Sequence, residues 1–424
     1  MIRRPLTIPP RPDLLGPARI LAGLGAAVLA AGAFFAPERV WPALLVAGLF
    51  TTGLGLAGLV YVAIHYTTGA GWDVAVRRVA EGVAGLVPAG ALLALVAVAA
   101  GGATLYPWWD GSLAAGEAGG HAFGPFKAWW LTPGFFLLRS VLYAGVWTAF
   151  ALVLRRLSRR QDEAAHGGPG PVRLAGGPAG PSMAGRLDPD PARGLTLRRR
   201  ATVVSAAFLP VFAVTSTLAT VDWAMSLEPH WYSTIYGVYH FAGLFVAGLS
   251  ALILLVVRLQ RGGPLAGRAT AEHLHDLGKL LFAMTTFWAY IWFSQYMLIW
   301  YGNLAEEVTH FTVRSEGPWA PLFWVNPIVG WVVPFLVLLP RGPKRDATVL
   351  SRVAGLLLAG HALDLYLAVY PTVHAGGPVF GGWEAGIALG TFGLVALVLH
   401  RALAGAPAVP VGDPHLAESL HHHG

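Results

Sequence analysis

Long apolar runs separated by short polar segments recur along almost the whole 424-residue chain. A helix needs about 20 apolar residues to cross the hydrocarbon core of a bilayer, and ten runs are about that long or longer. They cover residues 18–36, 41–65, 79–101, 135–154, 201–222, 232–257, 277–300, 321–340, 348–370 and 383–403. The pattern predicts an all-α, polytopic integral membrane protein with about ten transmembrane helices.

The composition agrees with a lipid environment. The chain is 55% hydrophobic and 12% charged, and its mean hydropathy is +0.58, whereas soluble domains carry about 25% charged residues. The net charge of +7 comes without a recognisable nucleic-acid fold, so we expect membrane lipid and no nucleic acid as a partner. Because cysteine is absent, thiolate-held iron–sulfur clusters and covalently attached haem would have to reside on other subunits.

The lysines and arginines predict the orientation. Of the 29 basic residues, 25 lie in or beside the connections on the side that holds both chain ends, and four lie on the other side. These four are Arg39, Lys127, Arg139 and Arg314. Cytoplasmic loops carry the excess of basic residues, and ten spans put both ends on one side. We therefore expect both termini in the cytoplasm.

One segment divides the chain. Residues 161–194 are rich in glycine, proline and alanine and lack periodicity, which is typical of a flexible linker. The predicted organisation is a first membrane half at 1–160 with spans one to four, this cytoplasmic linker, a second half at 195–405 with spans five to ten, and a cytoplasmic tail at 406–424.

Ionisable residues within or next to the predicted spans divide into two sets by depth. An ionisable side chain in hydrocarbon costs about 2.5–3.5 kcal/mol on insertion scales, so such residues usually face a bundle interior or a water-filled cavity. The inner set is His273, His275, Asp276 and Lys279. The outer set is Asp222, His240, His361 and Asp364. Histidines and carboxylates can relay protons, so these residues are our candidate proton pathway, with an inner and an outer mouth.

Other interpretations of these residues stay open. Asp276 and Lys279 share a helical face and could be a neutralised pair at an interface. His240 could be a packed core residue, or His240 and His361 could hold a haem between two helices. The cluster HLHD at 273–276 is the nearest approach to a metal site, but Lys279 beside it argues against one. We therefore predict neither a metal ligand nor a catalytic residue.

Three blocks resemble a known family. DWAMSLEPHWYSTIYGVY at 222–239, EHLHDLGKLLFAMTTFWAYIWFSQYMLIWYGNLAEE at 272–307 and, further on, PFLVLL…HALDLYLAVYP are similar, in that order, to the NrfD-like polytopic membrane subunits. The likeness is to the second such subunit, the ActF type, of bacterial alternative complex III. The match is densest over residues 220–370.

The resemblance implies two four-helix bundles, spans two to five and six to nine, flanked by the first and last helices. It also implies a subunit without its own redox centre in a quinol:cytochrome c or other electron-acceptor oxidoreductase of a respiratory or photosynthetic chain in a bacterial inner membrane. The implied partners are a sister NrfD-like subunit, an iron–sulfur/molybdopterin-like subunit and c-type cytochrome subunits. Menaquinone or ubiquinone is the implied candidate cofactor, bound non-covalently, and proton translocation is a further expectation.

Two other functions remain as alternatives. An autonomous proton-coupled secondary transporter would use the same buried charges for coupling and should show paired broken helices in corresponding halves. A purely structural membrane anchor of the complex would need only its apolar faces. Such an anchor would tolerate neutralisation of Asp276 or Asp364.

Overall fold

The computed structural model describes residues 7–115, 122–165 and 191–422. Within these ranges the chain is helical, and its only β-type pairing is a single bridge between Thr7 and Pro407. Nine of the described helical segments are long and apolar enough to span a membrane. The prediction of an all-α polytopic membrane protein is confirmed.

The helices follow the predicted spans. The long ones are α1 (Pro12–Phe35), α2 (Pro37–Thr67), α3 (Val74–Ala84), α4 (Val87–Ala100), α8 (Pro133–Ala165), α9 (Pro191–Trp223), α10 (Tyr236–Gln260), α11 (Ala271–Gly302), α16 (Ala347–Val373) and α17 (Gly382–Leu403). Span eight consists of α13 (Ala320–Pro327), the π-helical turn η3 (Ile328–Val332) and α14 (Val333–Leu338). Shorter elements are α5 (Gly102–Leu105), α6 (Ser112–Ala115), α7 (Pro125–Trp130), η1 (Met225–Leu227), α12 (Ala305–Ser315), η2 (Gly317–Trp319), α15 (Arg341–Arg345) and α18 (Leu416–Leu420).

Helix α11 takes the place of the predicted seventh span but is not among the nine apolar segments. Its 32 residues would extend about 48 Å, which is ample to cross a bilayer. Its sequence is rich in tryptophan, tyrosine and polar residues, and this composition lowers its hydropathy. The helix begins at a capping box in which Thr270 and His273 satisfy each other's backbone N–H groups.

The third predicted span is broken into α3 and α4 at Gly85 and Leu86. Pro88 lies in the first turn of α4, and because proline has no N–H, it cannot bond the carbonyl four residues earlier. The chain instead makes two tighter turns there, from Gly85 N to Gly82 O and from Leu86 N to Val83 O. The hydrophobic run therefore predicted the span but not its interruption.

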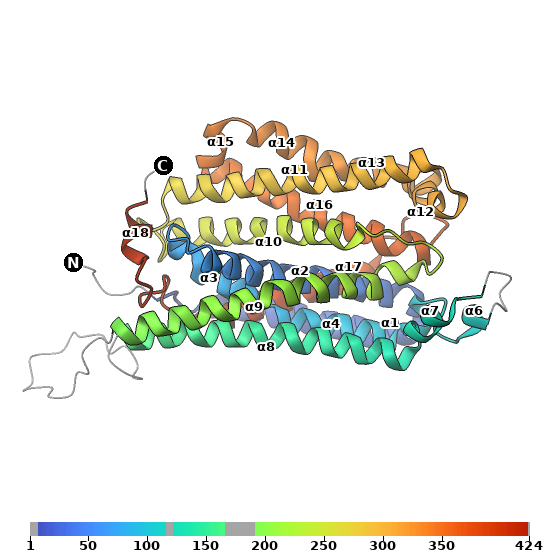
Figure 1. Cartoon of the computed structure of the whole chain (residues 1–424), viewed down its shortest axis with the longest axis horizontal. Helices are drawn as coiled ribbons and strands as arrows, with labels where there is room; N and C mark the ends of the chain where they lie inside the picture. Colours follow the sequence, from blue (N-terminus) through green and yellow to red (C-terminus); the bar gives the residue numbers. More distant parts are fainter. Residues whose placement is uncertain (1–6, 116–121, 166–190, 423–424) are drawn as a thin grey trace, which may run out of the picture.

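Packing groups the helices into two bundles (Figure 1). The first contains α2, α3–α4, α8 and α9, and the second contains α10, α11, α13–α14 and α16. Helix α1 packs along α17, and this pair lies against α2. The arrangement is the one that the family resemblance implies. It cuts across the two sequence halves, because α9 follows the predicted linker yet packs against α8.

The two ends of the bundles differ. One end carries α15, α18 and the first described residues, and the other carries α6, α7 and α12 (Figure 1). We call these the inner and outer ends, following the orientation that the basic residues predict. Ile8 and Ala406 are joined by a backbone hydrogen bond of 2.9 Å, so both described ends of the chain meet at the inner end.

The described edges of the predicted linker are helical, and the predicted tail is folded. Residues 161–165 and 191–194 continue α8 and α9 as helix, while residues 166–190 lie outside the described residues. The tail folds onto the inner end: the buried Asp413 carboxylate pairs with Arg77 at 2.5 Å and with Arg198 at 2.6 Å. Two buried arginines need counter-charges, and the tail supplies one carboxylate to both.

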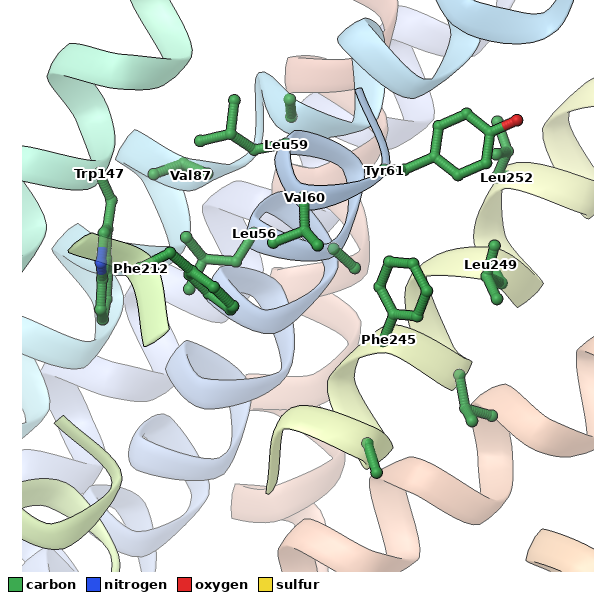
Figure 2. Packing of buried hydrophobic residues seen from close by; sticks show 14 of the residues in the cluster. Leu56, Leu59, Val60, Tyr61, Val87, Trp147, Phe212, Phe245, Leu249 and Leu252 are labelled. Atoms are coloured by element: carbon green, nitrogen blue, oxygen red, sulfur yellow. The ribbon is translucent and has the colours of Figure 1, made fainter. Parts of the chain in front are cut away.

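Between these ends, the inner part of the second bundle is filled by an apolar layer of buried side chains, which includes Leu249, Leu252, Leu281, Val353 and Leu357. Figure 2 shows Val60 and Tyr61 of α2 on the side that faces Phe245, Leu249 and Leu252 of α10, where the two bundles meet. Helix α2 also approaches α4 closely, since a Cβ atom at Gly55 would lie only 2.6 Å from the backbone nitrogen of Val87. Small residues permit such backbone contacts between membrane helices.

Candidate functional site

The centre of the candidate site is Asp364, a carboxylate buried in the second bundle. It lies on α16, nine residues or about 14 Å before the outer end of that helix. Tyr239 of α10 donates its hydroxyl to Oδ1 of Asp364, and Asn326 of α13 donates its amide Nδ2 to the same oxygen at 2.8 Å. Both donors are neutral, so hydrogen bonds rather than a counter-charge hold this carboxylate.

The second oxygen of Asp364 faces a histidine. Nδ1 of His361 lies 3.9 Å from Oδ2, one helical turn earlier on the same face of α16. That distance is beyond a direct hydrogen bond, and Nδ1 has no hydrogen-bond partner in the described part of the chain. Oδ2 and His361 can therefore exchange a proton through one small movement or one bridging water.

His361 also borders a cavity of about 50 Å³ between the two bundles. His240 of α10 and Thr52 of α2 line the same cavity. Nε2 of His240 and Oγ1 of Thr52 are buried and find no hydrogen-bond partner among the residues that the structure covers. A cavity holds a water once it offers about 10–15 Å³ to the probe. The space and its polar atoms therefore suit a few water molecules.

Glycines bring the backbone close around this cluster. A Cβ atom at Gly243 would lie 3.0 Å from the His361 ring and 3.5 Å from Oδ2 of Asp364. A cavity of about 10 Å³ beside Asp364 is lined by Gly330 of the π-helical turn η3 and by Gly360 of α16. Single π-turns occur often at functional sites, and here the turn directly follows the segment that carries Asn326.

A third cavity, of about 40 Å³, connects Asp364 with the outer end. Its lining includes Asn326, Gln295, His310 and Arg314. The three cavities share His361, Asp364 or Asn326 as walls. They therefore form a series of small cavities next to His361 and Asp364.

Arg314 of α12 closes the outer side of this region. It donates to Oε1 of Glu228 at 2.6 Å and through Nε to the carbonyl of Leu367 at 2.9 Å. That carbonyl lacks its helical partner because Pro371, four residues later, has no N–H. The arginine thus replaces a lost helical hydrogen bond and ties α12 to α16.

Glu228 and His310 form the rest of this outer group. Nδ1 of His310 lies 3.0 Å from Oε2 of Glu228, and the imidazole stacks on Trp231 with ring centres 3.8 Å apart. Burial alone would raise the pKa of Glu228, but the charges of Arg314 and His310 outweigh it and hold the pKa at about 2. Burial lowers the pKa of His310 to about 4. At neutral pH this is an ionised carboxylate beside a neutral imidazole.

Asp222, expected in the same outer mouth, lies in the first bundle instead. Arg139 of α8 holds it with two hydrogen bonds, of 2.8 and 2.9 Å. Tyr143 and Trp130 each add one of 2.9 Å. Arg139 supplies a counter-charge to Asp222, and Asp222 lines none of the three cavities beside His240, His361 and Asp364.

The inner set of predicted residues is also divided. Asp276 pairs with Lys279 at 2.5 Å and with His422 at 2.6 Å. His273 instead caps α11 through Thr270 and lies 3.3 Å from Ser419 of the tail. His275 points to Glu272 at 3.8 Å. His273 and Asp276 contact the folded tail, and the apolar layer lies between the level of these side chains and that of Asp364.

The haem and metal interpretations can be compared with this geometry. His240 and His361 do share a cavity, but about 50 Å³ is far below the several hundred Å³ of a pocket for a large ligand. The residues present therefore do not fit a haem. No group of three or more potential metal ligands occurs among the described residues.

Sequence reasoning missed several partners in these clusters. Tyr239, Asn326, Arg139 and Glu228 are separated from their partners by 38 to 125 residues in sequence, so helical spacing could not reveal them. One signal was available: Pro371 within a predicted span leaves a carbonyl without its partner and calls for an outside donor. The buried pair of Arg77 and Asp73, four residues apart, was likewise detectable from spacing.

Comparison with known proteins adds no relative, since no family model and no curated protein matches this chain.

Proposed function

We propose that this chain is a proton-handling membrane subunit of a quinol:electron-acceptor oxidoreductase of the alternative complex III type, and that it has no redox centre of its own. The observation that carries the proton role is the environment of Asp364. Its described partners are two neutral donors and a neighbouring imidazole. A buried carboxylate without a counter-charge favours taking up a proton.

The positions of the cavities indicate the side of the membrane with which Asp364 exchanges protons. A small cavity extends from Asp364 toward Arg314 and His310 at the outer end, whereas the apolar layer lies on the inner side of Asp364. In this conformation Asp364 exchanges protons with the outer side. Transport across the whole membrane would need a second conformation in which the apolar layer opens.

The likeness of residues 220–370 to NrfD-like subunits supports the assignment to a complex. The partners that we propose are a sister NrfD-like subunit, an iron–sulfur/molybdopterin-like subunit and c-type cytochromes, with menaquinone or ubiquinone as the quinol of the complex. A chain without cysteine depends on such partners for iron–sulfur clusters.

The proposed location is the inner membrane of a bacterium, with both termini in the cytoplasm. A reporter inserted in the loop at 261–269 should report cytoplasm, and one inserted at 375–381 should report the opposite side. The basic asymmetry supports this orientation. Swapped signals would reverse it.

The transporter alternative gains no support from the helix interruptions. In the described chain one lies in the second helix of the first bundle, between α3 and α4, and another in the third helix of the second bundle, at η3. These positions do not correspond to each other. A transporter with repeated broken helices would place them in matching positions.

Purification of the native protein from its own membranes tests the assignment. We expect the proposed redox subunits to co-purify in fixed ratio, and quinol oxidation by the complex to be lost when this chain is deleted. A chain that purifies alone and transports a solute in vesicles would overturn the proposal.

A further inference from the structure

A long apolar groove of about 570 Å³ runs between α2, α16 and α17. Helix α17 packs closely against α1 and α2 but barely against α16, so the groove follows the gap between α16 and α17. Small side chains keep this gap wide, notably Ala47 on α2, Ala362 on α16, and Ala385 and Ala388 on α17.

The groove has the length of one lipid chain. Along α17 its lining extends from Glu384 to Val395, eleven positions or about 17 Å. One leaflet of hydrocarbon is about 15 Å deep, half of the bilayer core. Glu384 belongs to the first turn of α17, at the outer end, so the groove extends from the outer membrane edge to about the midplane.

A pair of opposite charges marks the outer end of the groove. Arg39 donates to the two carboxylate oxygens of Glu384 at 2.9 and 2.7 Å. The side chain of Arg39 is 28% exposed, and its third nitrogen takes no part in these two bonds. A zwitterionic headgroup complements such a pair, with its phosphate at the guanidinium and its ammonium at the carboxylate.

The interior of the groove offers little to a quinone ring, whose oxygens need hydrogen-bond donors. The Tyr366 hydroxyl donates to the carbonyl of Val379 at 3.0 Å and accepts from the N–H of the same residue at 2.9 Å. The Thr391 hydroxyl is used within its own helix, donating to Ile387 at 2.8 Å. The Tyr370 hydroxyl donates to the carbonyl of Arg39 at 3.5 Å. Apart from Glu384, the other lining side chains are aliphatic or aromatic, which suits a hydrocarbon chain.

We propose that this groove binds one acyl chain of an outer-leaflet zwitterionic phospholipid, with the headgroup at Arg39 and Glu384. The bound chain completes the packing of α17 against the second bundle. The inference rests on the membrane-spanning fold and is independent of the assignment to a quinol-oxidising complex.

Filling the groove tests the proposal. Ala388→Phe places a ring in the groove, and Ala385→Leu is the milder form; both alanines are solvent-exposed in the isolated chain, so neither change overpacks the core. Ala206→Phe on the exposed face of α9 is the matched control. Phospholipid and quinone retained per chain are measured by extraction and mass spectrometry after purification from native membranes.

We expect Ala388→Phe to lose about one phospholipid per chain, Ala385→Leu to lose part of one, and Ala206→Phe to lose none, with quinone content unchanged. Equal phospholipid in all variants would overturn the proposal. Loss of quinone instead of phospholipid would overturn it in favour of a quinone site. Subunit composition, measured on the same samples, reports separately on the proposed complex.

A second variant tests the headgroup position. Glu384→Gln removes the negative charge beside Arg39, so retained lipid should shift toward anionic headgroups. An unchanged headgroup composition would contradict the placement at this pair.

Discussion

Asp222 and Asp364 are two buried carboxylates on the fourth helices of the two bundles, and their surroundings are opposite. Asp222, at the end of α9, is gripped by Arg139 and two further donors. Asp364, deeper in α16, has only neutral donors and one oxygen turned to His361. The comparison shows that burial alone does not identify a proton site. The two carboxylates differ in whether a nearby cation stabilises the ionised form, as Arg139 does for Asp222.

The largest expected effect comes from breaking the compensated pair. Arg139→Leu leaves Asp222 buried and uncompensated, so the free energy of unfolding should fall by about 3–5 kcal/mol. Thermal unfolding of the purified protein measures the loss. Because replacing both charges removes the uncompensated ion, Arg139→Leu combined with Asp222→Asn should recover most of it. A single variant as stable as the wild type would mean that the pair is not a structural ion pair.

Arg314 provides the second test, since it compensates Glu228 rather than Asp364. Arg314→Gln removes the donor to Glu228 and to the carbonyl of Leu367, and we expect a loss of about 2–3 kcal/mol. Adding Pro371→Ala gives that carbonyl a helical N–H and should restore part of the stability. No rescue in the double variant would show that the carbonyl does not depend on Arg314.

Acid stability sharpens the comparison at the outer edge. The pKa of His310 is about 4 in the folded protein and about 6.5 in the unfolded chain. Between these pH values the unfolded chain binds a proton that the folded protein does not, so the stability falls as the pH drops from about 6.5 to 4. The pKa of Glu228 is about 2, so its contribution is lost between about 4.5 and 2. One proton corresponds to at most about 1.4 kcal/mol per pH unit. In unfolding curves, His310→Gln should flatten the upper part, and because it also removes a charge beside Glu228, it should weaken the lower part as well. An unchanged slope in the upper part would refute the assignment.

Neutralising Asp364 should have a small effect on stability and a large one on proton exchange. Asp364→Asn keeps the shape and an oxygen that accepts from Tyr239, so we expect a loss below about 1 kcal/mol. In vesicles of the assembled complex, the ratio of protons released to quinol oxidised should fall.

Asp276→Asn is the matched change at the inner end. Because Asp276 lies in a partly exposed pair, this variant should lose less than about 0.5 kcal/mol and keep the ratio. If both variants keep the wild-type ratio of protons released to quinol oxidised, Asp364 has only a structural role.

The spanning helices could be predicted from the sequence because apolar runs of this length are characteristic of helices that cross a membrane. The sequence also placed His361 and Asp364 on one face of a helix, and the structure has them 3.9 Å apart. It could not separate Asp222 from that site, because the partner Arg139 lies 83 residues away on another helix. The fold of the tail was equally hidden, since Asp413 is a lone carboxylate in a polar segment until Arg77 and Arg198 converge on it.

The central claim is that Asp364 changes its protonation while Asp222 and Asp276 do not. Infrared difference spectra of the native complex, recorded on addition of quinol, detect this change directly through the C=O stretch of a protonated carboxyl group. We predict a carboxyl band in the wild type and in Asp276→Asn that disappears in Asp364→Asn while the variant complex stays assembled. A band that persists unchanged in Asp364→Asn would contradict the account.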